Sequence, residues 1–320
     1  MYAYAQDVHF SQYYFSPLSL NPAHTGNFKA DYRGFLNYRS QWKELGQAYE
    51  TYSAGADLNF YPKGNNYSGG FLFINDRSAG DLLVNKIMFS GARHMRFAGF
   101  KLHGGLQMAF VMKRIDPYST TFPNQLNWNT GGFDPTLPNF ETGLIQKDNF
   151  LDINLGLATE KRIGRLITEG GFALFHVNTP KESLNGYKTK IPMRKALTLA
   201  LGWQFTEKFS AKLHTLYGFT TKTSDWVSGI TLDYIFNSGP FFNNSFFTGF
   251  MWRSGINRNA DAGIATAGFN INNYTFGFSY DLTFSKLKTS VDMRGAYEIA
   301  IIFRGKHTRI TKKEVPCERY

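Results

Sequence analysis

The feature that most constrains the fold is a strict alternation of apolar and polar side chains over unusually long segments. Between positions 98 and 113, even positions hold residues such as Phe100 and Phe110, whereas odd positions hold Lys101 and Gln107. Successive side chains of a β-strand point to opposite faces, so this pattern predicts a strand with one apolar and one polar face. The alternation recurs at 151–157, 197–205, 291–303 and, with a slip of register near Tyr280, at 274–282.

Strand length separates a membrane barrel from a soluble β-sandwich, whose strands also alternate. Sandwich strands are usually about 5–6 residues long, whereas a tilted membrane strand needs about 9–11. About 14 strands of the longer kind, an even number, predict an all-β fold, a transmembrane antiparallel β-barrel of the bacterial outer membrane. Turn signals place these strands at 28–39, 49–61, 69–76, 82–93, 98–114, 150–161, 168–178, 192–205, 208–219, 226–237, 244–253, 260–270, 273–284 and 289–304.

The composition agrees with a barrel and excludes a helical membrane protein. The mean hydropathy is −0.32, and no apolar run approaches the length of about 20 residues that a membrane-crossing helix needs. Aromatic residues nevertheless make up 17% of the chain. In a barrel, one face of each strand meets lipid and the other meets a polar lumen, and aromatic residues ring both membrane interfaces.

The net charge of +11 indicates acidic partners, and both the phosphates of lipopolysaccharide in outer-membrane lipid and an acidic protein fit it. We expect no nucleic acid as a partner, because the basic residues are spread through the strands rather than clustered. A single cysteine, Cys317, excludes an internal disulfide and a metal site made of cysteines.

Four parts are predicted along the chain: a signal-peptide remnant at 1–5, an N-terminal segment at 6–27, the barrel at 28–304 and a basic periplasmic tail at 305–320. Ala3-Tyr4-Ala5 before Gln6 has the A-x-A form of a signal-peptide cleavage site, with an ordinary N-terminal arm as the alternative. The tail either binds an acidic periplasmic partner or is a solvated chain end.

The N-terminal segment is too aromatic to hang free in water, so we expect it to enter the periplasmic mouth of the barrel as a plug. Inward-facing charges such as Asp152, Asp281 and Glu298 have to pair across the lumen, because an unpaired buried charge costs several kcal/mol. Ile153, Leu199 and Phe278 are expected to face lipid. The residues predicted to bind a partner at the plug and lumen are His9, Phe10, Gln12, Tyr13, Asn21, Arg33, Arg39 and Asp57.

The longest connection, at 115–149, falls on the extracellular side if both chain ends are periplasmic, and long loops belong there. Its aromatic side chains either recognise a protein partner or anchor the loop to the barrel rim. These candidate partner-binding residues are Tyr118, Phe122, Trp128, Phe133 and Phe140.

The sequence gives little evidence of a catalytic site or of a site for a metal ion or a cofactor. His176 and Asn178 share a strand face, but a barrel lipase needs a serine two residues from its histidine, and position 174 is Leu. The seven histidines are scattered without metal-ligand spacing. We therefore expect a non-enzymatic protein with no catalytic residue, no metal and no cofactor.

Several short blocks of the sequence stand out beside the alternation: Gln6-Asp7-Val8-His9-Phe10-Ser11-Gln12-Tyr13, Leu20-Asn21-Pro22-Ala23, Gly26, Asn37-Tyr38-Arg39, Gln41-Trp42, Thr51-Tyr52-Ser53-Ala54, Phe175-His176-Val177-Asn178 with Pro180, Tyr280-Asp281 and Tyr297-Glu298-Ile299. Together these blocks resemble a known family, the PorP/SprF-type outer-membrane proteins of the type IX secretion and gliding system of Bacteroidetes. The family usually has His where this chain has Tyr297.

The resemblance implies a binding role rather than chemistry. Members of the family help to export or retain cell-surface proteins, often large adhesins, that carry a type IX C-terminal signal, or they belong to the secretion machinery and contact its other components. The alternative is a passive porin or a fatty-acid-channel-like transport barrel. A porin, however, needs an open lumen lined by one prevailing charge, and the predicted lumen carries both signs.

Overall fold

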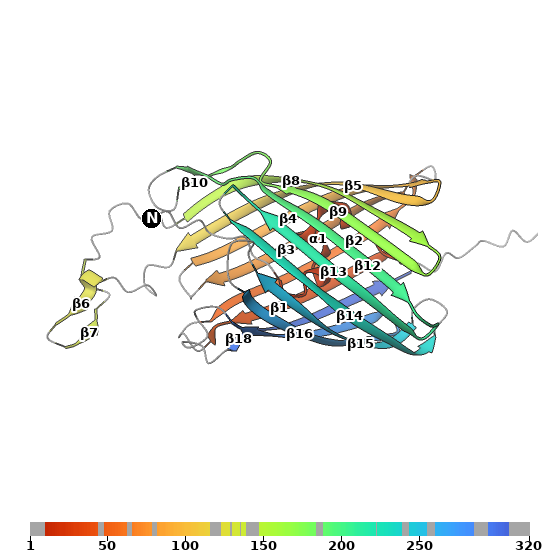
Figure 1. The fold of residues 1–320 in the computed structure, drawn as a ribbon. Helices are drawn as coiled ribbons and strands as arrows, with labels where there is room; N and C mark the ends of the chain where they lie inside the picture. The colour runs from red at the N-terminus through yellow and green to blue at the C-terminus, as the bar shows by residue number, and fades with distance from the viewer. Residues whose placement is uncertain are drawn as a thin grey trace, which may run out of the picture.

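Fourteen antiparallel strands close into a barrel in the computed structural model (Figure 1). The structure describes residues 10–43, 48–62, 66–78, 82–115, 123–128, 130–134, 136–138, 147–183, 188–221, 223–238, 243–254, 260–284 and 294–306. Each barrel strand pairs with its neighbours in the chain, and the first strand pairs with the last, from Tyr32 opposite Gly305 to Gln41 opposite Ala296. The predicted fold class is therefore confirmed.

The barrel strands are longer than those of a typical sandwich, as the alternation predicted. They are β1 (Tyr32–Gln41), β2 (Tyr49–Phe60), β3 (Asn66–Ser78), β4 (Leu82–Phe97), β5 (Phe100–Ile115), β8 (Lys147–Ile163), β9 (Leu166–Phe175), β12 (Arg194–Gln204), β13 (Phe209–Phe219), β14 (Ser224–Ser238), β15 (Asn243–Ser254), β16 (Ala260–Ile271), β17 (Tyr274–Thr283) and β18 (Arg294–Gly305). Two small hairpins lie outside the barrel: β6 (Leu126–Asn127) with β7 (Gly132–Phe133), and β10 (Lys181–Glu182) with β11 (Thr189–Lys190).

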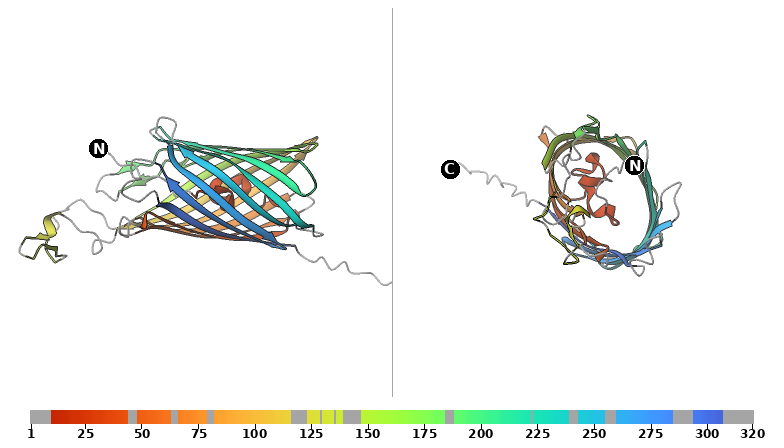
Figure 2. Two further views of the ribbon diagram at one scale, coloured as in Figure 1. Left: turned by 60° about the horizontal axis from the view of Figure 1, so that its bottom comes forward. Right: turned by 90° about the vertical axis from the view of Figure 1, so that its left-hand side faces the viewer.

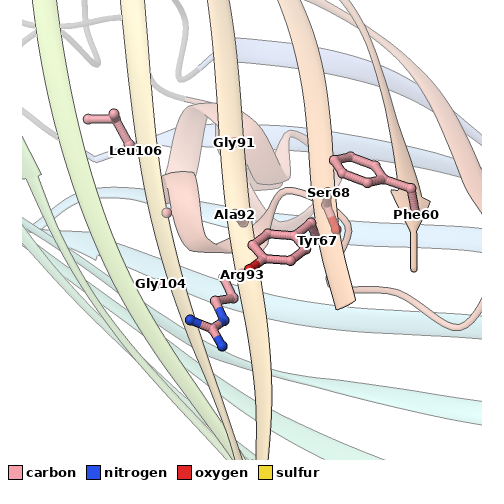
Figure 3. A pocket seen from close by; sticks show the side chains of 9 residues that line it. Phe60, Tyr67, Ser68, Gly91, Ala92, Arg93, Gly104 and Leu106 are labelled. Atoms are coloured by element: carbon pink, nitrogen blue, oxygen red, sulfur yellow. The ribbon is translucent and has the colours of Figure 1, made fainter. Parts of the chain in front are cut away.

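The two faces of the wall are the ones predicted. Leu199 and Phe278 are about half exposed on the outside, at 50% and 48%, whereas Asp152, Asp281 and Glu298 are buried inside. Among the described residues, no helix is long and apolar enough to cross a membrane. On the outside of β3, β4 and β5, small residues leave a hollow of about 480 Å³ (Figure 3).

The two ends of the barrel differ in their connections. At the end that holds Tyr32 and Gly305, here called the turn end, two-residue turns join several strand pairs. Gly99, Gly164 and Asn272 supply the positive φ angles of 93°, 58° and 52° there. At the opposite end, here called the loop end, the connections include 116–146, 176–193 and 284–293. This asymmetry is that of outer-membrane barrels, whose long loops are extracellular.

The N-terminal segment lies inside the barrel, as the view down its axis shows (Figure 2). It contains a 3-10 turn, η1 (Tyr13–Phe15), a single helical turn, α1 (Pro17–Leu20), and a second 3-10 turn, η2 (Pro22–His24). It leads into β1 at Tyr32 rather than at residue 28, where the first strand was predicted to begin. The segment is therefore longer than predicted and occupies the lumen itself rather than only one mouth.

Candidate functional site: the plugged lumen

The part of the lumen segment between Val8 and Phe28 carries no formal charge, whereas the wall around it is charged. No Asp, Glu, Lys or Arg occurs between Val8 and Phe28. Burial raises the pKa of the phenols of Tyr13 and Tyr14 well above its ordinary value, so both stay neutral. The charged side chains shown below to bind this part of the segment belong to barrel strands.

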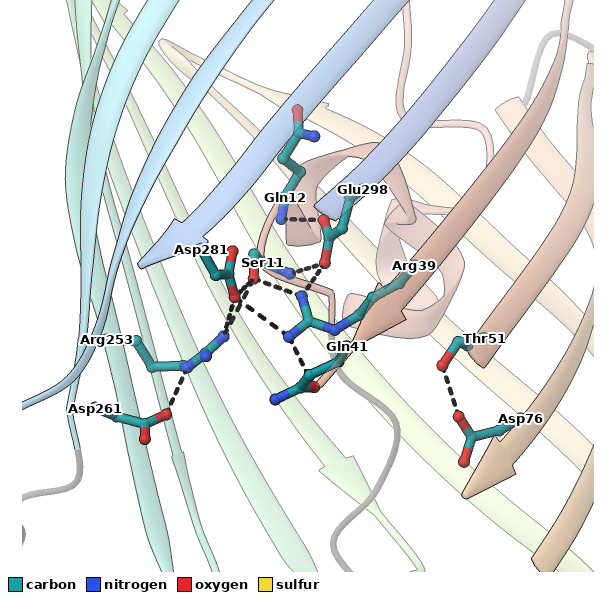
Figure 4. A network of polar contacts seen from close by, with 10 residues as sticks. All are labelled: Ser11, Gln12, Arg39, Gln41, Thr51, Asp76, Arg253, Asp261, Asp281 and Glu298. Atoms are coloured by element: carbon teal, nitrogen blue, oxygen red, sulfur yellow. Dashed lines mark hydrogen bonds and ion pairs between the residues drawn. The ribbon is translucent and has the colours of Figure 1, made fainter. Parts of the chain in front are cut away.

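Near the loop end, four charged side chains from four strands form a buried cluster, here called the lumen ion network (Figure 4). It consists of Arg39 of β1, Arg253 of β15, Asp281 of β17 and Glu298 of β18. Arg39 contacts Glu298 and lies 3.3 Å from Asp281, and Arg253 lies 3.0 Å from the same Asp281 oxygen. Charges buried this deeply are tolerated only when they are paired and hydrogen-bonded.

The lumen ion network binds the segment both through its backbone and through the hydroxyl of Ser11. The main-chain N–H groups of Ser11 and Gln12 donate to the two carboxylate oxygens of Glu298, at 2.6 and 2.9 Å. The Ser11 hydroxyl donates to Asp281 at 2.7 Å and accepts from Arg39 and Arg253 at 2.7 and 3.1 Å. The hydroxyl of one short, uncharged residue thus forms hydrogen bonds with three buried ions.

Near the turn end, a second charged pair holds the other end of the segment. Arg33 donates to both oxygens of Asp57, at 2.9 and 2.6 Å, and to the carbonyl of His24 at 3.1 Å. Asp57 also accepts from the main-chain N–H of Gly26 at 2.7 Å. Gly26 has a φ of +70°, a left-handed conformation that suits glycine.

Between the two ends, Asn21 fixes the segment to the barrel backbone. Its side-chain amide donates to the carbonyls of Leu157 and Phe172, at 3.0 and 3.3 Å. Its side-chain oxygen accepts from the N–H of Ala23 at 2.9 Å and so caps η2. One asparagine therefore bonds two strands and the segment itself.

The wall is shaped to receive η2. Gly105 of β5 and Gly156 of β8 face each other in the barrel register. A Cβ atom at Gly105 would collide with the Pro22 backbone, and one at Gly156 would collide with the Asn21 side chain. The segment and the two strands therefore approach each other at a distance that only glycine allows.

Apolar side chains of the segment complete its packing. Tyr13 packs with Met251 and Ile264, whereas Leu18 packs with a separate cluster on the other side of the lumen. Phe15 packs against Phe247, with 6.1 Å between the ring centres. Burial of a large apolar side chain contributes about 1.5–3 kcal/mol. Since the contacts extend over opposite sides of the lumen, the segment spans the lumen from one side to the other.

The predicted lumen residues that the structure describes lie inside the barrel, and their charged members fall into two groups, one near each end. Phe10, Gln12, Tyr13, Asn21, Arg33, Arg39 and Asp57 are all buried inside the barrel, and His9 lies outside the described residues. Sequence reasoning missed Ser11, Arg253 and the two glycines as contacts of the segment. The sequence could have identified Arg253 as a lumen residue, because it lies two residues after Met251, on the inward face of the predicted strand at 244–253.

The predicted loop residues are only partly described. Trp128 and Phe133 belong to the β6–β7 hairpin region, and their exposed fractions are 86% and 52%. Phe133 lies opposite Leu126 in that hairpin. Tyr118, Phe122 and Phe140 lie outside the described residues. The two described aromatic side chains are thus available to solvent at the loop end.

His176, the histidine weighed for catalysis, lies just beyond the end of β9 with a φ of +58°. Its ring Nδ1 lies 3.0 Å from a carboxylate oxygen of Asp152, and its main-chain N–H donates to Asn154 at 3.1 Å. Within the described ranges, no three His, Cys, Asp or Glu side chains are placed to hold a metal ion. The contacts of His176 are those of a residue that ties β9 to β8.

Comparison with solved structures shows the same architecture in other barrels. The toluene transporter TbuX of Ralstonia pickettii is 12% identical with a TM-score of 0.54, over 91% of this chain and 94% of that chain. The monoaromatic hydrocarbon channel CymD is 11% identical with a TM-score of 0.51, over 91% and 93% of the two chains. At such identities the likeness shows the fold alone. No curated protein matches the chain by sequence.

A family model identifies the chain more closely. The model described as type IX secretion system membrane protein PorP/SprF matches residues 3–303. This match covers the N-terminal segment and nearly the whole barrel, including the residues that bind the two together. The outer-membrane type of barrel agrees with it and gives the location. The chain therefore belongs to the PorP/SprF family of type IX secretion system membrane proteins, and it is a protein of the bacterial outer membrane.

Proposed function

We propose that this protein is a non-enzymatic barrel that binds a protein partner in type IX secretion. The partner is an exported cell-surface protein of the adhesin type, which the barrel helps to export or retains at the surface, or subunits of the secretion system. Membership of the family supports a role in secretion.

The observation that carries the proposal is the built-in occupation of the lumen by the chain's own segment. Residues 10–31 are bound at both ends and in the middle by wall residues, through the contacts of Glu298, Asn21 and Asp57. A segment bound in this way obstructs the lumen, which supports a binding role over passive transport of solutes. The surfaces left for a partner are the ends of the barrel, and at the loop end Trp128 and Phe133 present exposed aromatic side chains of the kind that anchor protein interfaces.

The proposal is tested by isolating the full chain from its native outer membrane after chemical crosslinking and identifying the proteins that come with it. We expect a surface protein with a type IX C-terminal signal, or secretion-system subunits, to accompany the parent. The double variant Trp128→Ala with Phe133→Ala should hold less of it. Trp203→Ala on the lipid face is the matched control, because that side chain is also exposed, at 46%, but lies at the turn end of β12.

Conductance in a planar bilayer tests the alternative. We expect the parent protein to conduct negligibly, because the segment is bound across its lumen. A stable open pore, or saturable uptake of a small or lipidic solute without any protein partner in the crosslinking experiment, would contradict the proposal. Either result would instead support a passive porin or a fatty-acid-channel-like transport barrel.

A further inference from the structure

The outer wall of the barrel has a hollow that combines small residues with an arginine, whereas a surface that meets only lipid chains needs neither (Figure 3). Its volume is about 480 Å³, and it lies over β3, β4 and β5 near the turn end. Its lining comprises the side chains of Phe60, Tyr67, Arg93 and Leu106 and the wall at Ser68, Gly91, Ala92, Gly104 and Gly105.

Outward-facing glycines form the floor of the hollow at Gly91 and Gly104 and continue beside it at Gly69. Gly69 pairs with Gly91 across β3 and β4, and Gly104 lies on the adjoining β5, opposite Arg93. A Cβ atom at any of the three would meet no atom closer than 3.8 Å, so the space above them is open. Elsewhere the wall presents large side chains such as Phe71 and Phe89 to the outside.

A cation stands at one edge of this floor. Arg93 is exposed on the lipid-facing side of β4, and among the described residues no carboxylate lies within ion-pair distance of it. Its guanidinium lies 5.6 Å from the centre of the Tyr67 ring. Tyr67 in turn stacks on Phe60, with 6.2 Å between the ring centres. Aromatic residues of this kind mark the membrane interface in barrels.

Along the strands, the cation and the apolar hollow follow each other in the same order as the headgroup and the acyl chain of a lipid molecule. Arg93 lies at the level of Phe60 and Tyr67, close to the turn end. Gly91 lies two residues nearer to the middle of β4, and it pairs with Leu106 of β5. The cation thus stands at the interface, and the apolar hollow continues from it toward the middle of the membrane. Arginine matches phosphate oxygens with two parallel hydrogen bonds.

We propose that the hollow is a binding site for one glycerophospholipid of the leaflet at the turn end. The phosphate pairs with Arg93, and an acyl chain lies over Gly69, Gly91 and Gly104. This occupant supplies the anion that Arg93 otherwise lacks among the described residues and fills the space that the glycines leave. The site is independent of the partner-binding role proposed above, because it lies on the outside of the wall.

The test is native mass spectrometry of the full chain in detergent, titrated with phosphatidylglycerol. We expect one lipid to bind ahead of the rest. Arg93→Gln removes the charge and should weaken that first binding about tenfold, or about 1.4 kcal/mol. Gly91→Leu fills the hollow and should remove the preference for a first lipid. Heat modifiability on gels confirms that each variant is folded, and Arg93→Gln leaves the hollow's shape intact if Gly91→Leu fails to fold.

Two variants serve as matched controls. Arg77→Gln removes an exposed arginine from the lipid-facing side of β3 near the loop end, and Gly34→Leu fills open space outside β1, where no atom lies within 4 Å of a Cβ. Both should bind the first lipid like the parent. Equal binding by the parent and Arg93→Gln would overturn the proposal. So would a first site that takes lipopolysaccharide in preference to phosphatidylglycerol.

Discussion

Asp281 binds three other side chains in the lumen through one oxygen atom. One of its carboxylate oxygens accepts from two guanidiniums, those of Arg39 and Arg253, and from the Ser11 hydroxyl. The side chain is fully buried. If the carboxylate is lost, two buried cations lose a shared partner, and the segment loses one of its bonds to the wall.

Asp281→Asn should therefore lower the free energy of unfolding by about 3–5 kcal/mol, the range for breaking a buried ion pair by removing one partner. The control is Asp225→Asn, whose side chain is 39% exposed and pairs with Arg194 at 3.5 Å. That change should cost no more than about 1 kcal/mol, because exposed ion pairs contribute little. Urea unfolding in detergent, followed by tryptophan fluorescence, measures both. Equal losses would show that the lumen ion network is solvated.

Residues of this kind were only partly predictable from the sequence. Alternation placed Asp281 and Glu298 inside the barrel, and both are there. It did not predict that they bind backbone N–H groups of Ser11 and Gln12, because a main-chain donor has no sequence signature. Gly105 and Gly156 were missed for a related reason. What a glycine permits depends on the element that approaches it from across the lumen.

At the scale of elements, the strands were predicted well and their ends less well. Alternation detects the stretch in which one face is buried, and together with the turn signals it located all fourteen strands. It continued through Phe28, Lys29 and Ala30, although the Phe28 N–H donates to the Gly26 carbonyl there and the backbone still belongs to the segment. Similarly, β9 ends at Phe175, because His176 adopts a left-handed conformation that ends the strand. The slip foreseen near Tyr280 corresponds to a register shift between β17 and β18.

The contact between η2 and the wall is open to a sharp test at this scale. Gly105→Ala places a methyl group against the Pro22 backbone and should expel η2, whereas Gly104→Ala points outward, where the nearest atom is 3.8 Å away. The readout is Ser16→Cys in a Cys317→Ser background, since Ser16 is fully buried. A water-soluble maleimide should label this cysteine many times faster in Gly105→Ala than in Gly104→Ala. Equally slow labelling of the two would mean that the wall adapts to the methyl group.

At the scale of the whole molecule, the barrel does not need the N-terminal segment in order to close. The ring of strand pairs is closed without the segment, since β1 pairs with β18 over the full length of β1. The segment adds contacts to the inside of a wall that is already continuous. Removal of the segment would expose Arg39, Glu298 and Asp57 to lumen water, which solvates charges well, so closure of the barrel does not depend on it.

Deletion of residues 6–26 should therefore leave a barrel that still folds and still shows heat modifiability, but that conducts ions where the parent does not. Deletion of residues 307–320 is the control, because it removes chain beyond β18 and should leave conductance unchanged. If the plug also helps to present the partner-binding end, the first deletion should reduce the amount of crosslinked partner as well. Bilayer recordings and crosslinking on the same preparations measure the two effects separately. A truncated barrel that conducts no better than the parent and holds its partner equally well would show that the segment is neither a plug nor part of the binding surface.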